Sequence, residues 1–364
     1  MYRQDPINIE YALHKTSKTH RFPPANDRNA WEKICMTLGE EEIKQHLSAA
    51  ENAAVEDIQE IRATEYLTAK RTGEYEQFGR FWRKRRKMLC DLTLGECLEG
   101  KGRFLDPLLD IAWAICEESS WVQSGYQIEL ADMQKPVVDL SATETGLALS
   151  EMAALLEESI DPALYKRIAY EVDRRLFVPY TTSHDFWWLF NCPTRELNPV
   201  VNNWTAVCNA GIIGAALYME KDQARQAEMV SRAVQSVYDY LETFDVDGGS
   251  EEGPAYWNYG FGHYVILADF IHHFTGGAVD LMEGDRIRKI ARFPLRTVLS
   301  PGFYANFSDA DARAVYSKPL LVYLAKRLGM VEFNQLAGYQ GKHDNPNELF
   351  HWRLRSLFWR LPED

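Results

Sequence analysis

Long apolar segments, signal-peptide features and an excess of basic residues are all missing from this sequence. No apolar run approaches the roughly 18 residues that a membrane-spanning helix needs, so no membrane partner is expected. The net charge of −13 argues against nucleic acid as a partner, because phosphate groups require a basic surface. The first residues, MYRQDPINIEYALHK, contain no apolar signal core, so we expect a cytoplasmic protein, or a secreted or periplasmic one if a leader has been removed.

Paired cysteine motifs are also missing. None of the six cysteines forms a CxxC pair, and several lie within apolar helical patterns, where a free thiol behaves as a small hydrophobic residue. This distribution favours a reducing compartment over a disulfide framework. The cysteines are Cys35, Cys90, Cys97, Cys116, Cys192 and Cys208.

Strand-like alternation is scarce, whereas amphipathic helical patterns follow one another from Asn26 onwards. We count about a dozen helices joined by short turns, with no fixed-period repeat. Short stretches at 126–134 and 301–308 suit brief strands or loops. The sequence therefore predicts an all-α fold, an incomplete (α/α) toroid of helix hairpins. Residues 1–25 are predicted to form an irregular N-terminal arm and residues 26–364 a single toroid domain.

Local signals mark several helix boundaries. Gly39 is predicted to end the first toroid helix, and Asp106 to cap a later helix ahead of Pro107. The segment from Val55 to Gly73 is predicted to be helical. The basic run RKRRK, from Arg83 to Lys87, also lies in a helical pattern, which favours a solvated face over an anion site.

Aromatic residues are abundant, with 10 Trp, 18 Tyr and 17 Phe. They suit either a large core or a groove lined by flat rings, as in carbohydrate-binding clefts. Three loop-like segments combine aromatic and polar residues where a simple connection would carry Ser and Lys. They are TTSHDFWWLFNCPTRELNPVVNNW at 181–204, DGGSEEGPAYWNYG at 247–260 and SPGFYANFSDADAR at 300–313.

Two of these motifs, in this order, carry a family resemblance. VVNNWTAVCNAGIIGAAL followed by DVDGGSEEGPAYWNYG resembles the N-terminal toroid domain of the heparinase II/III-like polysaccharide lyases. The upstream segments ATEYLTAKRTG, ECLEGKGRFLDPLLDIAWAICEESSW and VDLSATETGLALSEMAALL agree with it. The resemblance covers roughly residues 25–360. It implies an enzyme, a carbon–oxygen lyase that acts on acidic polysaccharides or oligosaccharides without a metal or other cofactor.

Such lyases cleave uronic-acid glycans by β-elimination. A base removes the proton at C5, a donor neutralises the adjacent carboxylate, and an acid protonates the leaving O4. The resemblance implies that Tyr256 is both base and acid and that Asn202 neutralises the carboxylate, with Asn203 as the alternative. His184 is a further candidate donor or base. The residues assigned to substrate binding are Asn203, Trp204, Trp257, Trp188, Tyr259 and Glu252, the last as an orienting residue.

Each of these residues also has a purely structural interpretation. Tyr256 suits a half-buried ring that packs a turn, and Asn202 suits a helix N-cap, a role compatible with ligand binding. Trp204 and Trp257 suit the core as well as they suit sugar platforms. The acidic residues of DVDGGSEE could hold a metal, although their spacing is not that of an EF-hand.

Two other functional classes remain open. An (α/α)-barrel glycoside hydrolase would use paired carboxylates, Asp247 or Glu252 with Asp309. A glycan-binding relative would have kept the fold without the chemistry.

The sequence departs from the family pattern at two points. The family continues from the toroid into a β-sandwich that supplies another catalytic His, whereas no strand-rich second domain is predicted here. We therefore expect the catalytic set in this chain to be incomplete. Where relatives carry a His shortly after a Trp, in SSWVQSGYQIE, this chain has Tyr126.

Overall fold

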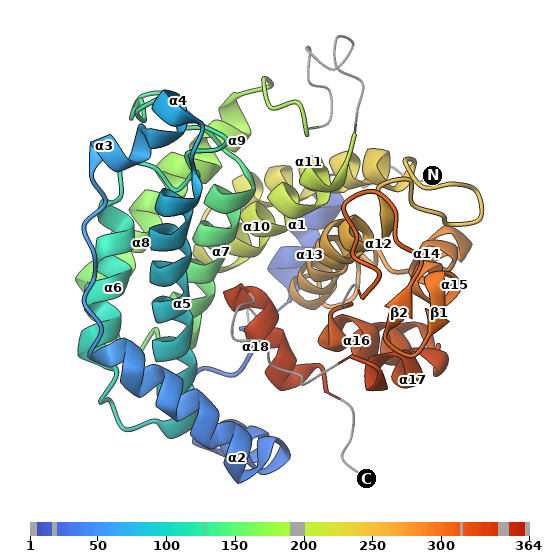
Figure 1. The fold of residues 1–364 in the computed structure, drawn as a ribbon, viewed down its shortest axis with the longest axis horizontal. Coiled ribbons are helices and arrows are strands. Elements are labelled where there is room, and N and C mark those ends of the chain that lie inside the picture. Colours follow the sequence, from blue (N-terminus) through green and yellow to red (C-terminus); the bar gives the residue numbers. More distant parts are fainter. Residues whose placement is uncertain are drawn as a thin grey trace. The chain divides into compact units, whose positions relative to one another are not determined.

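The computed structural model in Figure 1 describes residues 6–16, 20–127, 129–189, 201–313, 316–340 and 349–360. It is mostly helical, with 65% in helices and 2% in strands, which confirms the helical class predicted from the sequence. Strands among the described residues are limited to β1 (Val298–Ser300) and β2 (Phe303–Tyr304), which pair antiparallel. Residues 126–134 form turns and bends where they are described, with no strand.

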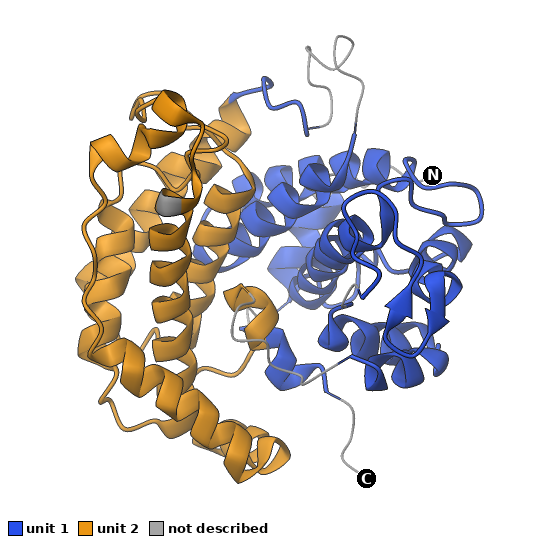
Figure 2. Cartoon of the chain, in the orientation of Figure 1, with its two compact units in different colours: residues 1–21, 183–345, 355–364 blue, residues 22–182, 346–354 orange. Residues whose placement is uncertain are grey.

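Contacts within the chain divide it into two compact units, whereas we expected one domain after a short arm (Figure 2). Unit 1 comprises residues 1–21, 183–345 and 355–364, and unit 2 comprises residues 22–182 and 346–354. Each unit is described by itself.

The helices of unit 2 come from the first half of the chain. They are α2 (Arg28–Ala54), α3 (Ala63–Tyr66), α4 (Thr68–Thr72), α5 (Glu76–Glu99), α6 (Leu105–Glu117), α7 (Leu140–Leu155), α8 (Pro162–Val172), the π-helical turn η1 (Asp173–Phe177) and α9 (Val178–Thr182). Helix α5 packs on α2, α6 and α7, and α8 packs on α6 and α7. Of the long consecutive helices, α5 and α6 pack together, as do α7 and α8.

Unit 1 combines the N-terminal helix with the second half of the chain. Its helices are α1 (Pro6–Lys15), α10 (Asn203–Met219), α11 (Gln223–Leu241), α12 (Gly253–Tyr256), the π-helical turn η3 (Trp257–Phe261), α13 (Gly262–Phe274), α14 (Asp285–Ala291), α15 (Phe293–Thr297), α16 (Lys318–Leu328) and α17 (Glu332–Gly338). Helix α18 (Phe350–Phe358) is divided between the units at residue 354. Helix α10 packs against α11, α13 and η3.

The predicted N-terminal arm is wrong as a description of residues 6–15. They form helix α1, which packs on α11 within unit 1. Ile9, Ala12 and Leu13 are buried, and their spacing of three and four residues places them on one face of the helix. Downstream, Phe22 is buried in unit 2, and the backbone N–H of Ala25 donates to the carbonyl of Leu155. Both ends of the expected arm are therefore tied to a core.

Several predicted helix boundaries shift by a few residues. Gly39 does interrupt α2, with φ 75° and ψ 163°, but the helix resumes beyond this kink and continues to Ala54. Residues 57–62 are not helical, so the helix predicted from Val55 to Gly73 shrinks to α3 and α4. Helix α6 begins at Leu105, so Asp106 lies in its first turn rather than at its N-cap.

The basic run in α5 is solvated only in part, because Arg83 and Lys87 are exposed whereas the two arginines between them are not. Arg85 and Arg86 are both buried, at 9% and 6% exposure, and both donate to the carboxylate of Glu118 in the same unit. Arg86 binds it with two parallel hydrogen bonds of 2.7 Å, the geometry that a planar guanidinium prefers. The prediction failed because the run contains charges on two faces of one helix, and one face meets a carboxylate from α6.

The five described cysteines are free thiols, and Cys192 lies outside the described residues. Cys90, Cys97, Cys116 and Cys208 are buried, and burial raises the pKa of the Cys116 thiol to about 12. Among the described helices, none is long and apolar enough to cross a membrane.

Asp139 caps the N-terminus of α7 from a buried position. Its Oδ1 accepts from the backbone N–H of Ala142 at 2.8 Å, whereas its Oδ2 has no hydrogen-bond partner among the described residues. Burial raises the pKa of this carboxyl to about 7 despite the backbone hydrogen bonds, which act in the opposite direction. The folded state therefore retains a proton that the unfolded chain releases near pH 4.

We expect unit 2 to lose stability as the pH rises through neutrality. Because the folded-state pKa of Asp139 is raised, its contribution is fully present below pH 4 and falls by about 2–3 kcal/mol between pH 5 and 8. The Asp139→Asn variant keeps the capping oxygen without the charge, so its free energy of unfolding should change little over this range. Urea unfolding at several pH values measures both proteins. Parallel curves for the two proteins would contradict this assignment.

Candidate functional site

All residues that the sequence assigns to a glycan site lie in unit 1. Asn202 and Asn203 are at the N-terminus of α10, Glu252 is the N-cap of the short helix α12, and Tyr256 is the last residue of α12. The π-helical turn η3, which follows Tyr256 directly, packs against α10. The chain thus brings the NNW and EGP-x-YW motifs together, although some 50 residues separate them.

Asn202 is the N-cap of α10, as one of its two sequence interpretations predicts. Its Oδ1 accepts from the backbone N–H of Trp204 at 3.0 Å, and its own backbone is extended. The amide Nδ2 of Asn202 has no hydrogen-bond partner among the described residues. Capping uses only the oxygen, so the amide N–H groups stay available to an acceptor at the positive end of the helix dipole.

Asn203 is committed to Glu252. Its Nδ2 donates to Oε1 of Glu252 at 2.7 Å, and its side chain is buried. Burial raises the pKa of the half-buried Glu252 carboxyl, and the two hydrogen bonds from Asn203 act in the opposite direction. Glu252 therefore joins the start of α12 to the start of α10, the type of contact expected of an orienting residue.

Tyr240 of α11 completes this buried cluster. It is fully buried, and its hydroxyl has no hydrogen-bond partner among the described residues. Burial, with a further contribution from the charge of Glu252, raises the pKa of Tyr240 well above its usual value. A proton therefore stays on this phenol, which excludes Tyr240 as a base.

Glycine at two positions allows the motif to approach its neighbours. Gly253 has φ 83°, and a Cβ there would lie 2.7 Å from the carbonyl oxygen of Phe307. Gly260 lies against α10, where a Cβ would collide with the Tyr240 hydroxyl and approach Cβ of Asn203 to 2.7 Å. Larger residues would therefore separate Tyr256 from both the asparagine pair and the loop that carries Asp309.

Tyr256 is half-buried at the end of α12, and its hydroxyl donates to Oδ2 of Asp309 at 2.7 Å. Asp309 is exposed, in the loop after β2. Glu252 precedes Tyr256 by four residues across one helical turn, a spacing that places side chains on the same face. Tyr256 therefore donates to an exposed carboxyl group and follows, by one helical turn, a half-buried carboxyl group with a raised pKa.

Two of the tryptophans assigned to substrate binding are core residues, and this part of the sequence assignment is corrected. Trp257 is completely buried, its Nε1 donates to the carbonyl of Ile290 at 2.9 Å, and its ring packs against Phe261 and Tyr316. Trp188 is 1% exposed and stacks on Phe186. A ring without accessible surface has no face to offer to a sugar.

Other aromatic residues remain accessible. Trp204 and Trp187 are half-buried, with their ring centroids 5.3 Å apart. Tyr259 is also half-buried and meets His263 edge-on at 4.9 Å. Trp187 precedes Trp188 directly in the sequence, and only Trp188 was assigned to substrate binding. Trp187 is the more accessible of the two, because adjacent residues direct their side chains differently.

His184 is exposed and lies beside Arg232 of α11. Nη2 of Arg232 lies 3.1 Å from Nδ1 of His184 and also donates to the carbonyl of Ser183 at 2.7 Å. Arg232 has no acceptor atoms, so Nδ1 accepts and the imidazole hydrogen is on Nε2. The exposed imidazole therefore offers its Nε2–H as a hydrogen-bond donor. No sequence signal marked Arg232, which belongs to an ordinary amphipathic helix.

The acidic loop DVDGGSEE is bound by arginines. Arg286 donates to the carbonyls of Asp245 and Leu241, and Arg296 donates to the carbonyl of Asp247. Nη1 of Arg296 also lies 3.4 Å from the Asp247 carboxylate. A guanidinium therefore occupies the place beside Asp247 that a metal ion would need.

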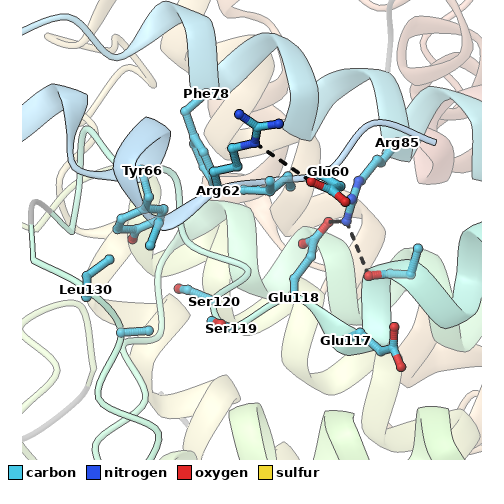
Figure 3. A pocket seen from close by; sticks show the side chains of 14 residues that line it. Glu60, Arg62, Tyr66, Phe78, Arg85, Glu117, Glu118, Ser119, Ser120 and Leu130 are labelled. Carbon is cyan, nitrogen blue, oxygen red and sulfur yellow. Dashed lines mark hydrogen bonds and ion pairs between the residues drawn. The ribbon is translucent and has the colours of Figure 1, made fainter. Parts of the chain in front are cut away.

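Sequence reasoning missed a pocket of about 370 Å³ in unit 2 (Figure 3). Its lining includes Tyr66, Arg85 and Glu118, which come from α3, α5 and the end of α6. The pocket was hidden because residues 57–62, which contribute to it, matched a helical pattern and suggested no cavity.

A scan against models of known protein families finds no match to this chain, and a search of curated proteins finds no match either.

Proposed function

We propose that unit 1 carries a polysaccharide-lyase site that cleaves uronic-acid glycans by β-elimination. The observation that supports this most directly is the arrangement around Glu252. It accepts from Asn203 at the N-terminus of α10 and lies one helical turn before Tyr256. Glu252 therefore links the N-terminus of α10, where we place the uronate carboxylate, to the helical turn that ends in the phenol of Tyr256.

In this proposal the uronate carboxylate binds at the N-terminus of α10. The amide of Asn202 donates to it, and the positive end of the helix dipole favours its negative charge. As the C5 proton leaves, charge builds up on this carboxylate, so the same contacts strengthen towards the transition state. Asn203 is the weaker candidate for this role, because Glu252 already accepts from its amide.

In the proposed reaction Tyr256 transfers a proton from C5 of the sugar to the leaving O4. Its hydroxyl donates to Asp309, so a shift of that proton to the carboxylate leaves a phenolate. The phenolate removes the proton from C5, the C4–O4 bond breaks as the C4–C5 double bond forms, and Tyr256 returns the proton to the leaving O4. The proton held by Asp309 then returns to the Tyr256 phenolate, which restores the starting hydrogen bond.

The substrate-binding surface would combine aromatic rings and a hydrogen-bond donor. Trp204 and Trp187 offer half-buried rings, and the exposed His184 offers an N–H donor for a second uronate. The proposal includes the (α/α) toroid implied by the resemblance. The packing of α5 on α6 and of α7 on α8 within unit 2 is compatible with paired helices of this kind.

A glycoside hydrolase is the second candidate, and one observation favours it. Glu252 lies four residues before Tyr256 and has a raised pKa, as a general acid requires, and Asp309 accepts from Tyr256 and offers a second carboxyl group. Asp247 is less suitable, because it pairs with Arg296.

The products distinguish the two reactions. We expect incubation with a panel of uronate polysaccharides, of heparan and alginate type, to generate an ultraviolet-absorbing unsaturated uronate at each new chain end. A hydrolase would instead produce reducing ends without this absorbance. Ligand-dependent melting without either product would indicate a binding protein and would overturn both catalytic assignments. The polymer cleaved fastest identifies the substrate class.

A further inference from the structure

The pocket in unit 2 has the size of a small-molecule site. Its volume of about 370 Å³ falls within the range of roughly 300–1,000 Å³ that is typical of ligand pockets. All of its lining residues belong to unit 2, so the proposed lyase chemistry of unit 1 does not account for it.

The pocket has an apolar wall and a polar wall. Figure 3 shows Tyr66 and Leu130 on one side and Arg85 with Glu118 on the other, with Ser119 and Ser120 between them. Tyr66 packs edge-to-face on Phe78, with their ring centroids 4.8 Å apart, which gives the apolar wall a rigid base. The pocket therefore suits a ligand with an apolar body and one polar end.

The polar wall is built on a buried group with a net positive charge. Arg85 and Arg86 share the single carboxylate of Glu118, and all three side chains are buried. Two cations and one anion leave one positive charge. In a poorly solvated site such a charge attracts an anion more strongly than it would on the surface.

Arg85 also retains hydrogen-bond donors. Nη1 donates to the carbonyl of Ala114 and to Glu118, and Nη2 donates to the carbonyl of Gln59. A guanidinium has five N–H donors, so one on Nε and one on Nη2 have no acceptor among the described residues. Neighbouring N–H groups of a guanidinium match the two oxygens of a carboxylate.

The charged groups nearer to solvent do not cancel the preference of the Arg85 group for an anionic ligand. Glu60 pairs with Arg62, with 3.8 Å between carboxylate oxygen and guanidinium nitrogen, and both are exposed. Glu117 is exposed and accepts from Nε1 of Trp113 at 2.8 Å. Solvent screens these charges, whereas the Arg85 group is shielded from it.

From these features we infer that unit 2 contains a binding site for a small amphipathic carboxylate, with its carboxylate at Arg85 and its apolar body against Tyr66 and Leu130. Ser119 and Ser120 are placed to contact polar groups between the two ends. This site is independent of the lyase proposal, so the outcome of either test does not affect the other.

Calorimetric titration of the full chain tests this inference with benzoate, phenylacetate and 3-phenylpropionate, each paired with its amide. We expect at least one carboxylate to bind saturably, with a Kd at least about tenfold lower than that of its amide. Equal affinities within every pair, or no saturable binding by any probe at millimolar concentration, would overturn the inference.

Two variants locate the binding. Leu130→Trp fills the apolar wall without touching Arg85 and should abolish binding, whereas Leu299→Trp, at an exposed leucine of β1 in unit 1, should leave it unchanged. Arg85→Lys keeps the charge but removes the planar pair of donors. It should raise the Kd of the carboxylate probe at least about tenfold and leave the Kd of the matching amide unchanged. Circular dichroism checks that each variant is folded. If Arg85→Lys does not fold, Leu130→Trp decides alone, and carboxylate binding that survives this substitution excludes the pocket.

Discussion

Replacing Tyr256 with phenylalanine is expected to lower the rate of β-elimination by about 10²–10⁴-fold while leaving glycan affinity nearly unchanged. Phenylalanine keeps the half-buried ring but removes the hydroxyl that donates to Asp309 and that carries the proton in the proposed mechanism. Initial rates of ultraviolet-absorbing product, measured on the polymer that the wild-type protein cleaves fastest, give kcat. Equilibrium titration with the same polymer gives the affinity.

A tyrosine outside the proposed site provides the matched control. Tyr238 of α11 is also half-buried, but neither the mechanism nor substrate binding assigns it a role. Tyr238→Phe should therefore retain most of the activity. Equal rates for wild type and Tyr256→Phe would show that this phenol is not the catalytic group. Another group of the site would then be the base for elimination, and Glu252→Gln would become the next variant to test.

Replacing Trp257 with alanine is expected to reduce the free energy of unfolding by about 3–5 kcal/mol, the range for a large aromatic residue removed from a core. Trp257 is fully buried, packs against Phe261 and Tyr316, and loses a hydrogen bond to Ile290 on substitution. Urea unfolding followed by circular dichroism measures the change. A loss of this size is large compared with the total stability of a typical domain.

Trp204 provides the comparison that distinguishes a tryptophan packed in the core from one that binds a sugar ring. It is half-buried and contacts Trp187, so Trp204→Ala should cost only about 1–2 kcal/mol and should weaken glycan binding instead. The two tryptophans were equivalent candidates in the sequence. If Trp257→Ala were as stable as wild type but bound glycan poorly, our assignment of Trp257 to the core would be incorrect.

Local features of the site could be predicted from the sequence. Asn202 precedes an apolar helical pattern, and N-capping depends only on the residue and the few that follow it. The Gly and Pro residues of DGGSEEGPAYWNYG indicated a sharp turn that ends in aromatic residues, and α12 and η3 follow it. The helical class followed from periodicity in the same way.

The pairing of distant residues could not be predicted in this way. Asn203 was assigned to the substrate, but it donates to Glu252, and Tyr256 donates to Asp309, which is 53 residues away. The α1 helix was interpreted as irregular, because ten residues give too short a pattern until their apolar face meets α11. Each of these outcomes depends on which other segment of the folded chain packs against the residues concerned.

The sequence by itself determined the helical class, the cap at Asn202 and the turn before Tyr256, because these features depend on interactions between residues a few positions apart. Only the tertiary structure decided that Trp257 and Trp188 are buried while Trp204 and Trp187 are accessible. It also decided that Arg85 and Arg86 bind Glu118 beside a pocket. Burial and ion pairing are properties of the surroundings of a side chain, and those surroundings come from segments that lie far apart in the chain.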